Sequence, residues 1–236
     1  MLNALTNERV IYSFKDLLDK QQLSDEIGYS NRWIYYHLLT YRATLLKQKK
    51  DKEKLSNYNY QTITLNLEEV ENSEFGCNGE TSCKLLRTKS PIPNFIDLES
   101  ITSVINTTGE TFTYTEISPE VIKYKQFSRL PSTSSQTYYY LQNIGNGVYV
   151  YLWSNNVEVS KAISIKMIAY EPHLLQAIKD CDGNLDPCYN YNTAEFIIDP
   201  ELLSIVSKMA IDGLLRFKSQ VSDNFSDGND KEQSPK

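Results

Sequence analysis

The sequence predicts an α+β fold with an N-terminal helical hairpin, a central, mostly antiparallel β region, and a C-terminal helix that packs back on the first helices. Three observations support this fold class. Apolar residues recur with helical spacing before residue 50 and after residue 200. From about residue 60 they alternate instead with a period of two. The dipeptide Asn146-Gly147 also separates two strand-like runs, which favours a β-hairpin because both residues tolerate positive φ.

The first 50 residues predict two antiparallel helices. Residues 7–22 form an amphipathic stretch, and Ser30 is placed to cap a second helix over about 31–50. Arg42 falls within the apolar stripe of the second helix, so we expect its guanidinium to reach the surface or to be paired. The apolar stripes consist of Val10, Ile11, Phe14, Leu17 and Leu18 in the first helix, and of Ile34, Tyr35, Leu38, Leu39, Tyr41, Leu45 and Leu46 in the second.

The central region predicts a series of short strands. In the first of them Ile63, Leu65 and Leu67 fall on one side, as in a half-buried strand. The second strand of the predicted hairpin separates into an aliphatic side (Val148, Val150, Leu152) and an aromatic side (Tyr149, Tyr151, Trp153). The predicted strands are Tyr60–Leu67, Lys84–Thr88, Ile101–Asn106, Thr111–Thr115, Tyr138–Asn143, Val148–Trp153 and Ala162–Ala169.

The C-terminal part predicts two further helices and a polar tail. Glu171-Pro172 opens a short helix over about 173–179, and a loop with two cysteines follows. Asp199-Pro200-Glu201 supplies an N-cap, a proline at the first helical position and a first-turn acid for a helix that ends near residue 219. We therefore expect a helical hairpin over 1–55, a β region over 56–171, a helical region over 172–220 that packs with the first, and a disordered tail over 221–236.

Composition narrows the possible function classes. The chain has 236 residues and a net charge of −6, which disfavours wrapping of nucleic acid because phosphate contacts require clustered Lys and Arg. We expect no membrane contact, since no apolar run is long enough for a transmembrane helix, and no secretion, since the first twenty residues are polar. The 17 tyrosines are unusual and indicate strands with surfaces suited to protein contacts.

Catalytic and metal-binding patterns are weak in this sequence, and we expect no enzyme, no cofactor and no metal. His37 and His173 are the only histidines, and neither lies beside a nucleophile motif. The string Asp180–Asp186 resembles a calcium loop, but its glycine is misplaced, so a loop of Asx turns is the alternative. The cysteines are Cys77, Cys83, Cys181 and Cys188, and zinc knuckles seldom use the spacings found here. We therefore expect neighbouring reduced thiols, and the alternative is that they form disulfide pairs after cell lysis.

Aromatic residues form the strongest candidate site, a possible subunit interface. Rigid aromatic rings supply contact area at low entropic cost, which favours a protein–protein contact. The alternative is that these rings belong to the core and lie beneath a neighbouring helix. The candidate residues are Trp33, Tyr36 and His37 on the second predicted helix, and Tyr138, Tyr139, Tyr140, Tyr149, Tyr151 and Trp153 on the predicted hairpin.

Several segments resemble a known family. The stretch Trp33-Ile34 to Tyr41-Arg42-Ala43-Thr44-Leu45-Leu46-Lys47-Gln48 resembles a helix with the pattern W-I-x-x-Y-R-A-x-L-I-x-Q in virion proteins of crAss-like bacteriophages of Bacteroidales. The segment from Cys77 and Cys83 through Leu86-Arg87-Thr88-Lys89 to Ile92-Pro93 is similar to the C-x-x-L-R-T-K-x-x-I-P stretch of that family. Tyr149-Val150-Tyr151, Glu171-Pro172 and Cys188-Tyr189 match later points, so the resemblance spans about residues 5–215.

The resemblance implies a structural virion protein that forms a ring of the head–tail connector. Such rings stack below the portal, usually with twelve copies, and contact the portal or other tail rings. Genomic DNA passes through their channel without sequence-specific binding, and assembly takes place in the host cytoplasm. One alternative is a cytoplasmic adaptor or assembly factor that binds a partner through residues 7–50. Another is a hydrolase or metal-dependent enzyme that uses His37, His173 or the Asp180–Asp186 loop.

Overall fold

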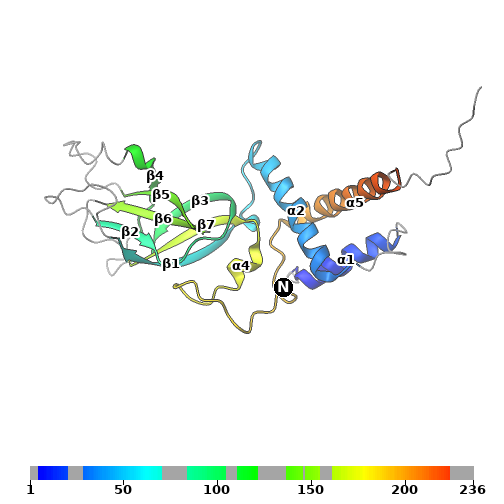
Figure 1. The fold of residues 1–236 in the computed structure, drawn as a ribbon, viewed down its shortest axis with the longest axis horizontal. Helices are drawn as coiled ribbons and strands as arrows, with labels where there is room; N and C mark the ends of the chain where they lie inside the picture. The colour runs from blue at the N-terminus through cyan, green and yellow to red at the C-terminus, as the bar shows by residue number, and fades with distance from the viewer. Residues whose placement is uncertain are drawn as a thin grey trace, which may run out of the picture. The chain divides into compact units, whose positions relative to one another are not determined.

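A computed structural model describes residues 5–20, 29–70, 84–104, 111–121, 137–145, 147–154 and 161–223. The chain divides into two compact units (Figure 1). The helical unit comprises Met1–Leu55 and Ile198–Lys236, and the sheet unit comprises Ser56–Ile197. Helices at both ends of the chain and an antiparallel-rich sheet between them confirm the predicted α+β class.

The helical unit contains α1 (Asn7–Lys20), α2 (Asn31–Lys50) and α5 (Pro200–Asp223). Helix α2 contacts both of the others. It begins at the predicted cap, where the Trp33 amide donates to Ser30 Oγ at 3.2 Å, and α5 begins where the Glu201 amide donates to Asp199 Oδ1 at 3.1 Å. No helix in the described part of the chain is long and apolar enough to cross a lipid bilayer.

The predicted helical stripes are buried, except that Leu17 is exposed and Tyr41 is half-buried. Arg42 lies within the buried stripe and does not reach the surface, and burial lowers its pKa to about 10. Leu17, expected in the stripe of α1, is exposed, whereas its neighbour Leu18 is buried. Residues 17 and 18 lie about 100° apart on a helix, so a narrow contact with α2 covers only one of them.

The sheet unit contains seven strands in the order β3-β7-β1-β2-β6-β5-β4. All neighbouring strands are antiparallel except the short pair β4 and β5, which is parallel. The unit also contains the 3-10 turn Asn57–Asn59 and helix α4 (Pro172–Gln176). The strands are β1 (Gln61–Glu69), β2 (Lys84–Thr88), β3 (Phe95–Ser103), β4 (Thr115–Glu116), β5 (Tyr138–Ile144), β6 (Gly147–Ser154) and β7 (Ala162–Ala169).

The two ends of this sheet are joined by one short segment, so the sheet closes into a barrel. At one end, the Ser103 amide of β3 donates to the Phe112 carbonyl at 2.8 Å and the Tyr114 amide donates to the Ile101 carbonyl at 2.9 Å. Immediately after, the Ile117 amide donates to the Tyr139 carbonyl of β5 at 2.9 Å. The segment thus pairs with Ile101–Ser103 of β3 through its first half and with Tyr138–Tyr139 of β5 through its second half, which links the two edges at these residues.

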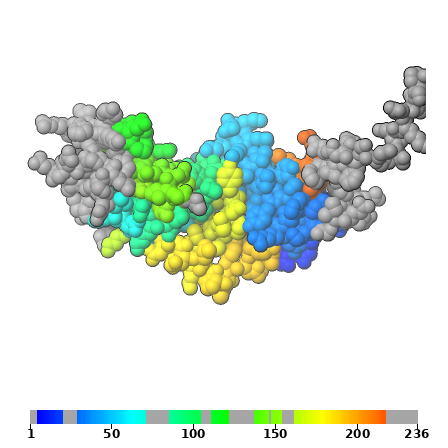
Figure 2. Space-filling model, in the orientation of Figure 1, coloured from blue at the N-terminus to red at the C-terminus, as the bar shows by residue number. Residues whose placement is uncertain are grey.

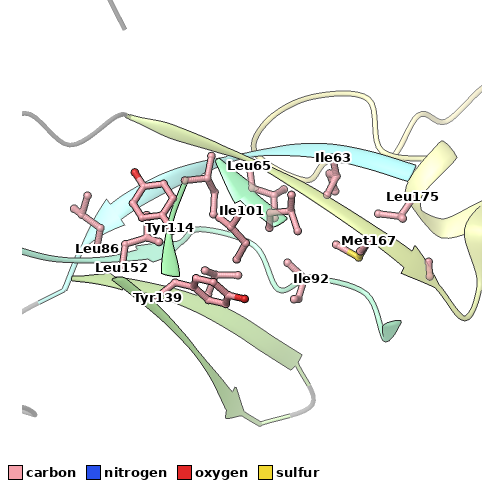
Figure 3. Close-up of a cluster of buried hydrophobic side chains, with 14 residues drawn as sticks. Ile63, Leu65, Leu86, Ile92, Ile101, Tyr114, Tyr139, Leu152, Met167 and Leu175 are labelled. Atoms are coloured by element: carbon pink, nitrogen blue, oxygen red, sulfur yellow. The ribbon is translucent and has the colours of Figure 1, made fainter. Parts of the chain in front are cut away.

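The barrel interior forms the core of the sheet unit, as Figure 3 shows. As predicted, β1 contributes Ile63 and Leu65, and β6 contributes Val150 and Leu152. Two tyrosines, Tyr114 and Tyr139, also lie inside, and burial raises the pKa of each to about 12. The other interior residues are Leu86, Ile92, Ile101, Ile163, Ile165, Met167, Ala169 and Leu175.

The predicted hairpin is present, with its turn one residue earlier than the Asn-Gly pattern suggested. Ile144 pairs with Gly147, so Gly145 and residue 146 are the two turn positions, and Gly145 has φ +58°. Residue 146 itself lies outside the described residues. Gly147 begins β6, where a Cβ atom would lie 2.6 Å from Pro91 Cβ. The second glycine is therefore required for close packing of the neighbouring chain, and the first for the turn.

Residues 172–197 group with the sheet unit, whereas we expected them with the helices. The Pro172 carbonyl accepts from Gln61 Nε2 of β1 at 3.2 Å, and Leu175 enters the barrel core. Further along, the Cys181 carbonyl accepts from the Asn66 amide of β1 at 2.7 Å. Burial of Leu175 and these two hydrogen bonds to β1 explain this grouping.

Candidate assembly surface

Four aromatic rings contact one another in a row that begins just before α2 and continues along it. Tyr29, Trp33 and His37 stack face to face, and Tyr41 meets His37 edge to face. The ring centroids of Tyr29 and Trp33 are 4.5 Å apart, those of Trp33 and His37 are 4.7 Å apart, and those of His37 and Tyr41 are 5.0 Å apart. Residues four apart lie one above the other on a helix, so this spacing lines the rings along one stripe. The stack makes each ring a support for the next, which holds Trp33 in a fixed orientation.

The inner end of this stack packs against α5. His37 Nε2 donates to the Ala210 carbonyl at 3.1 Å, and burial lowers the pKa of His37, opposed by this hydrogen bond. The Tyr41 hydroxyl lies over Gly213, where a Cβ atom would approach it to 1.7 Å. His37 and Tyr41 therefore join two helices of the same unit, and His37 serves this packing rather than an exposed interface.

Trp33 is the exposed ring of the stack, and Tyr36, which is not part of the stack, is exposed on the same helix. Trp33 is 40% exposed and Tyr36, one turn along, is 37% exposed. Arg32 lies over the Tyr36 ring with its Cζ 5.9 Å from the ring centroid. Helix α2 contains no Asp or Glu and five Lys or Arg residues, of which Arg42 is buried. We call the exposed residues Arg32, Trp33, Tyr36, Thr40, Thr44 and Lys47 the α2 face. It is basic and aromatic.

The aromatic residues of the β5–β6 hairpin are mostly buried. Tyr139 points into the barrel, whereas four other rings form a second cluster with Leu85 on the opposite side of the strands. In that cluster the rings of Tyr140 and Tyr151 stack with centroids 5.0 Å apart. The members of the cluster are Leu85, Tyr138, Tyr140, Tyr151 and Trp153, all buried. These side chains thus fit the core alternative, and an interface role for them would require the present packing to open.

Tyr149 is the one half-buried ring of the hairpin candidates. Arg87 of β2 lies over it, with Cζ 5.3 Å from the ring centroid, and also pairs with Glu68 of β1. The first cause of the raised Arg87 pKa is this hydrogen bond to Glu68, followed by one to Tyr151. Tyr149 is therefore held on its own barrel by a cation–π contact, while Trp33 and Tyr36 remain the most exposed of the predicted interface residues.

The Asp180–Asp186 loop is organised by its own hydrogen bonds. Asp180 accepts from the amides of Asp182 and Asn184 at 3.0 and 3.1 Å, and from Asn184 Nδ2 at 2.9 Å. The bonds from Asn184 lower the pKa of Asp180, and Asn66 and Lys89 lower that of Asp182. These hydrogen bonds form the Asx turns that the sequence offered as the alternative to a calcium loop. Within the described residues, no group of three or more His, Cys, Asp or Glu side chains could hold a metal ion.

The cysteines do not form a shared site in the described part of the chain. Cys181 and Cys188 are exposed free thiols on the loop that follows α4. Cys77 and Cys83 lie outside the described residues. His173, the second histidine, is half-buried on α4 in the sheet unit.

Sequence patterns missed several exposed apolar side chains. In the helical unit they are Tyr12 and Leu17 on α1, and Ile205 and Leu215 on α5. In the sheet unit, Leu174 on α4 and Leu185 on the following loop are also exposed. Tyr12 could have been found from its position, since it lies outside the apolar stripe of an amphipathic helix. Leu185 carries no such periodic pattern.

Comparison with known proteins agrees with the resemblance of the individual segments. A search of curated proteins found no match. A family model described as phage tail ring protein 2, from the crAss-like phages, matches residues 9–232. This match includes nearly all of both units. The chain therefore belongs to the phage tail ring protein 2 family of crAss-like phages.

Proposed function

We propose that this chain is a ring subunit of the head–tail connector, located below the portal in the virion, with genomic DNA passing through the ring. The observation that carries the proposal is the family match over residues 9–232. The proposed ring contains twelve copies, contacts the portal or another tail ring, and is assembled in the host cytoplasm before it enters the virion.

The closed barrel supports assembly through side-chain surfaces. A sheet with a free edge can join a second copy by adding a strand, but here the segment Phe112–Ile117 pairs with one end of β3 and one end of β5, which shortens the free edges. This arrangement favours contacts between copies through helices, loops or the outside of the barrel. The helical unit offers such a contact on α2, where the large side chains of Trp33 and Tyr36 are exposed.

The charge of the chain suits a DNA channel. A lining rich in Lys and Arg would bind phosphates and retard the passage of DNA. The chain carries a net charge of −6, so a channel built from many copies would repel the phosphate backbone. Sequence-specific binding is not needed for this role.

Particle mass and electron microscopy test the proposal. Purified protein at increasing concentration, and the tails of intact virions, should each contain a closed ring with a central pore, with twelve copies in the virion. Density for DNA through the pore and cross-links to the portal or an adjacent ring would support the connector role. A monomer at every concentration combined with absence from virions would overturn it, and detection only in infected cells would favour the adaptor alternative.

A further inference from the structure

The two units differ in charge. The sheet unit, Ser56–Ile197, contains nine Lys and Arg against sixteen Asp and Glu, a net charge of −7. The helical unit contains fifteen Lys and Arg against fourteen Asp and Glu, a net charge of +1, and its residues 1–55 alone have a net charge of +3. The net negative charge of the chain therefore belongs to the sheet unit, and the α2 face lies within the most basic part of the helical unit.

The α2 face combines this positive charge with exposed rings. The Trp33 ring stacks on the His37 ring, and the Arg32 guanidinium lies over one face of the Tyr36 ring. Tyr, Trp and Arg are the residue types most enriched among those that dominate the energy of protein interfaces. Because the stack restrains Trp33 before any partner binds, less side-chain entropy is lost on association. Figure 2 shows that α2, in light blue, contributes much of the visible surface of the helical unit.

A complementary surface lies on residues 172–197 of the sheet unit. Leu174 is 38% exposed and Leu185 is 63% exposed, and both belong to one motif, because Leu185 bridges to Ile178 just after α4. The Asp186 amide also donates to the Ala177 carbonyl at 2.7 Å, which holds the loop against the end of α4. This segment, yellow in Figure 2, has four Asp and Glu against one Lys, and of the four acids Asp182 pairs with Lys89 of the neighbouring chain segment at 3.2 Å. We call it the α4 loop.

We propose that the α2 face of one copy docks on the α4 loop of the next copy. The inference rests on the proposed ring function. A ring of identical subunits requires a heterologous contact, in which one patch fits a different patch on the neighbour. The two surfaces meet this requirement, because one is basic and aromatic and the other is acidic and aliphatic. An isologous contact between two α2 faces would place like charges together.

Three double variants test the contact. Arg32→Glu with Tyr36→Ala alters the α2 face, and Leu185→Ser with Glu195→Lys alters the α4 loop, where Glu195 is exposed. Arg9→Glu with Tyr12→Ala is a matched control, because it makes the same chemical changes at exposed positions of α1. Far-UV circular dichroism and the urea midpoint of each variant show whether it folds. Particle mass is then measured against concentration.

We expect the wild type and the α1 control to form rings at the same concentration. The α2-face variant and the α4-loop variant should each need a subunit concentration at least roughly 100-fold higher. Mixed in equal amounts, the two defective variants retain one intact α2 face and one intact α4 loop between them. They should therefore form a two-copy species and stop there.

The outcomes separate this inference from the proposed function. Rings formed by the wild type and, unchanged, by both surface variants would refute the contact and leave the ring function in place. A mixture that stays monomeric while each variant is folded would refute the pairing of these two surfaces. Failure of the wild type itself to form rings, alone and in virions, would refute the proposed function instead.

Discussion

Replacing Tyr151 with serine separates a folding role of the hairpin aromatics from an assembly role. Tyr151 is fully buried, and its ring stacks on that of Tyr140. Tyr36 is the matched position, a tyrosine on the α2 face with a large exposed fraction. We expect Tyr151→Ser to unfold or strongly destabilise the barrel, and Tyr36→Ser to leave the monomer intact while it weakens ring formation.

The expected magnitudes differ several-fold. Truncation of a large buried aromatic side chain costs about 3–5 kcal/mol, since transfer energy is lost and a cavity remains. A domain of ordinary stability has about 5–15 kcal/mol in total, so Tyr151→Ser would remove roughly a fifth or more of it. Substitutions at exposed positions are usually within about 0.5 kcal/mol, which is our expectation for Tyr36→Ser.

Tryptophan fluorescence can isolate the barrel in this measurement. The chain has 2 Trp residues, Trp33 on the α2 face and Trp153 in the buried cluster beside Tyr138. In a Trp33→Phe background, the emission of Trp153 alone reports the unfolding of the sheet unit in urea. The free energy of unfolding is obtained at protein concentrations below ring formation. Equal urea midpoints for Tyr151→Ser and Tyr36→Ser would refute the assignment of Tyr151 to the core.

Two further predictions concern the packing of α2 on α5. Gly213→Ala should destabilise the helical unit by about 1 kcal/mol, because overpacking against the Tyr41 hydroxyl (about 1–3 kcal/mol) exceeds the gain of about 1 kcal/mol in helix propensity. In a Tyr41→Ala background the same substitution should become stabilising in urea unfolding, and stabilisation with Tyr41 present would contradict the reasoning. Burial depresses the pKa of His37 below its ordinary value of 6.5, so the unfolded state binds its proton more readily. The His37 contribution to stability should thus be complete above pH 6.5 and decrease as the pH falls below it. In a plot of unfolding free energy against pH, His37→Gln should flatten this part of the curve. A curve unchanged by the substitution would contradict the burial of a neutral imidazole.

Local patterns predicted the elements where one short rule decides the structure. Alternation along β1 and β6 identified which side chains enter the barrel, since successive strand residues point to opposite faces. The caps Ser30 and Asp199 are near-neighbour features, and both helices begin where these residues are. The Asn-Gly pattern identified the hairpin but not its register. Two glycines, Gly145 and Gly147, lie close together there, and either could belong to the turn. Only the packing of Pro91, which is distant in sequence, shows that Gly147 is needed in the strand.

Features that depend on long-range contacts escaped the sequence. The β3 strand begins at Phe95, before the predicted Ile101, because its partner β7 extends that far. Closure of the barrel depends on Thr113 and its neighbours pairing with β3, which no local pattern signals. For the candidate site, the residue types of Tyr36 and Tyr151 are identical, and only the three-dimensional packing separates the exposed ring from the buried one.

Barrel closure and the exposure of α2 together explain why the helical unit is the better place to look for ring contacts. A strand edge binds any compatible strand through its backbone, so an open sheet would risk uncontrolled addition of copies. The segment Phe112–Ile117 occupies part of both edges and so limits that possibility within the described sheet. Contacts then depend on side chains, whose charge and shape can select one partner surface. In the proposed contact, Arg32 and Tyr36 on a helix without carboxylates would supply that selectivity, and the excess of acidic residues in the sheet unit would supply its complement.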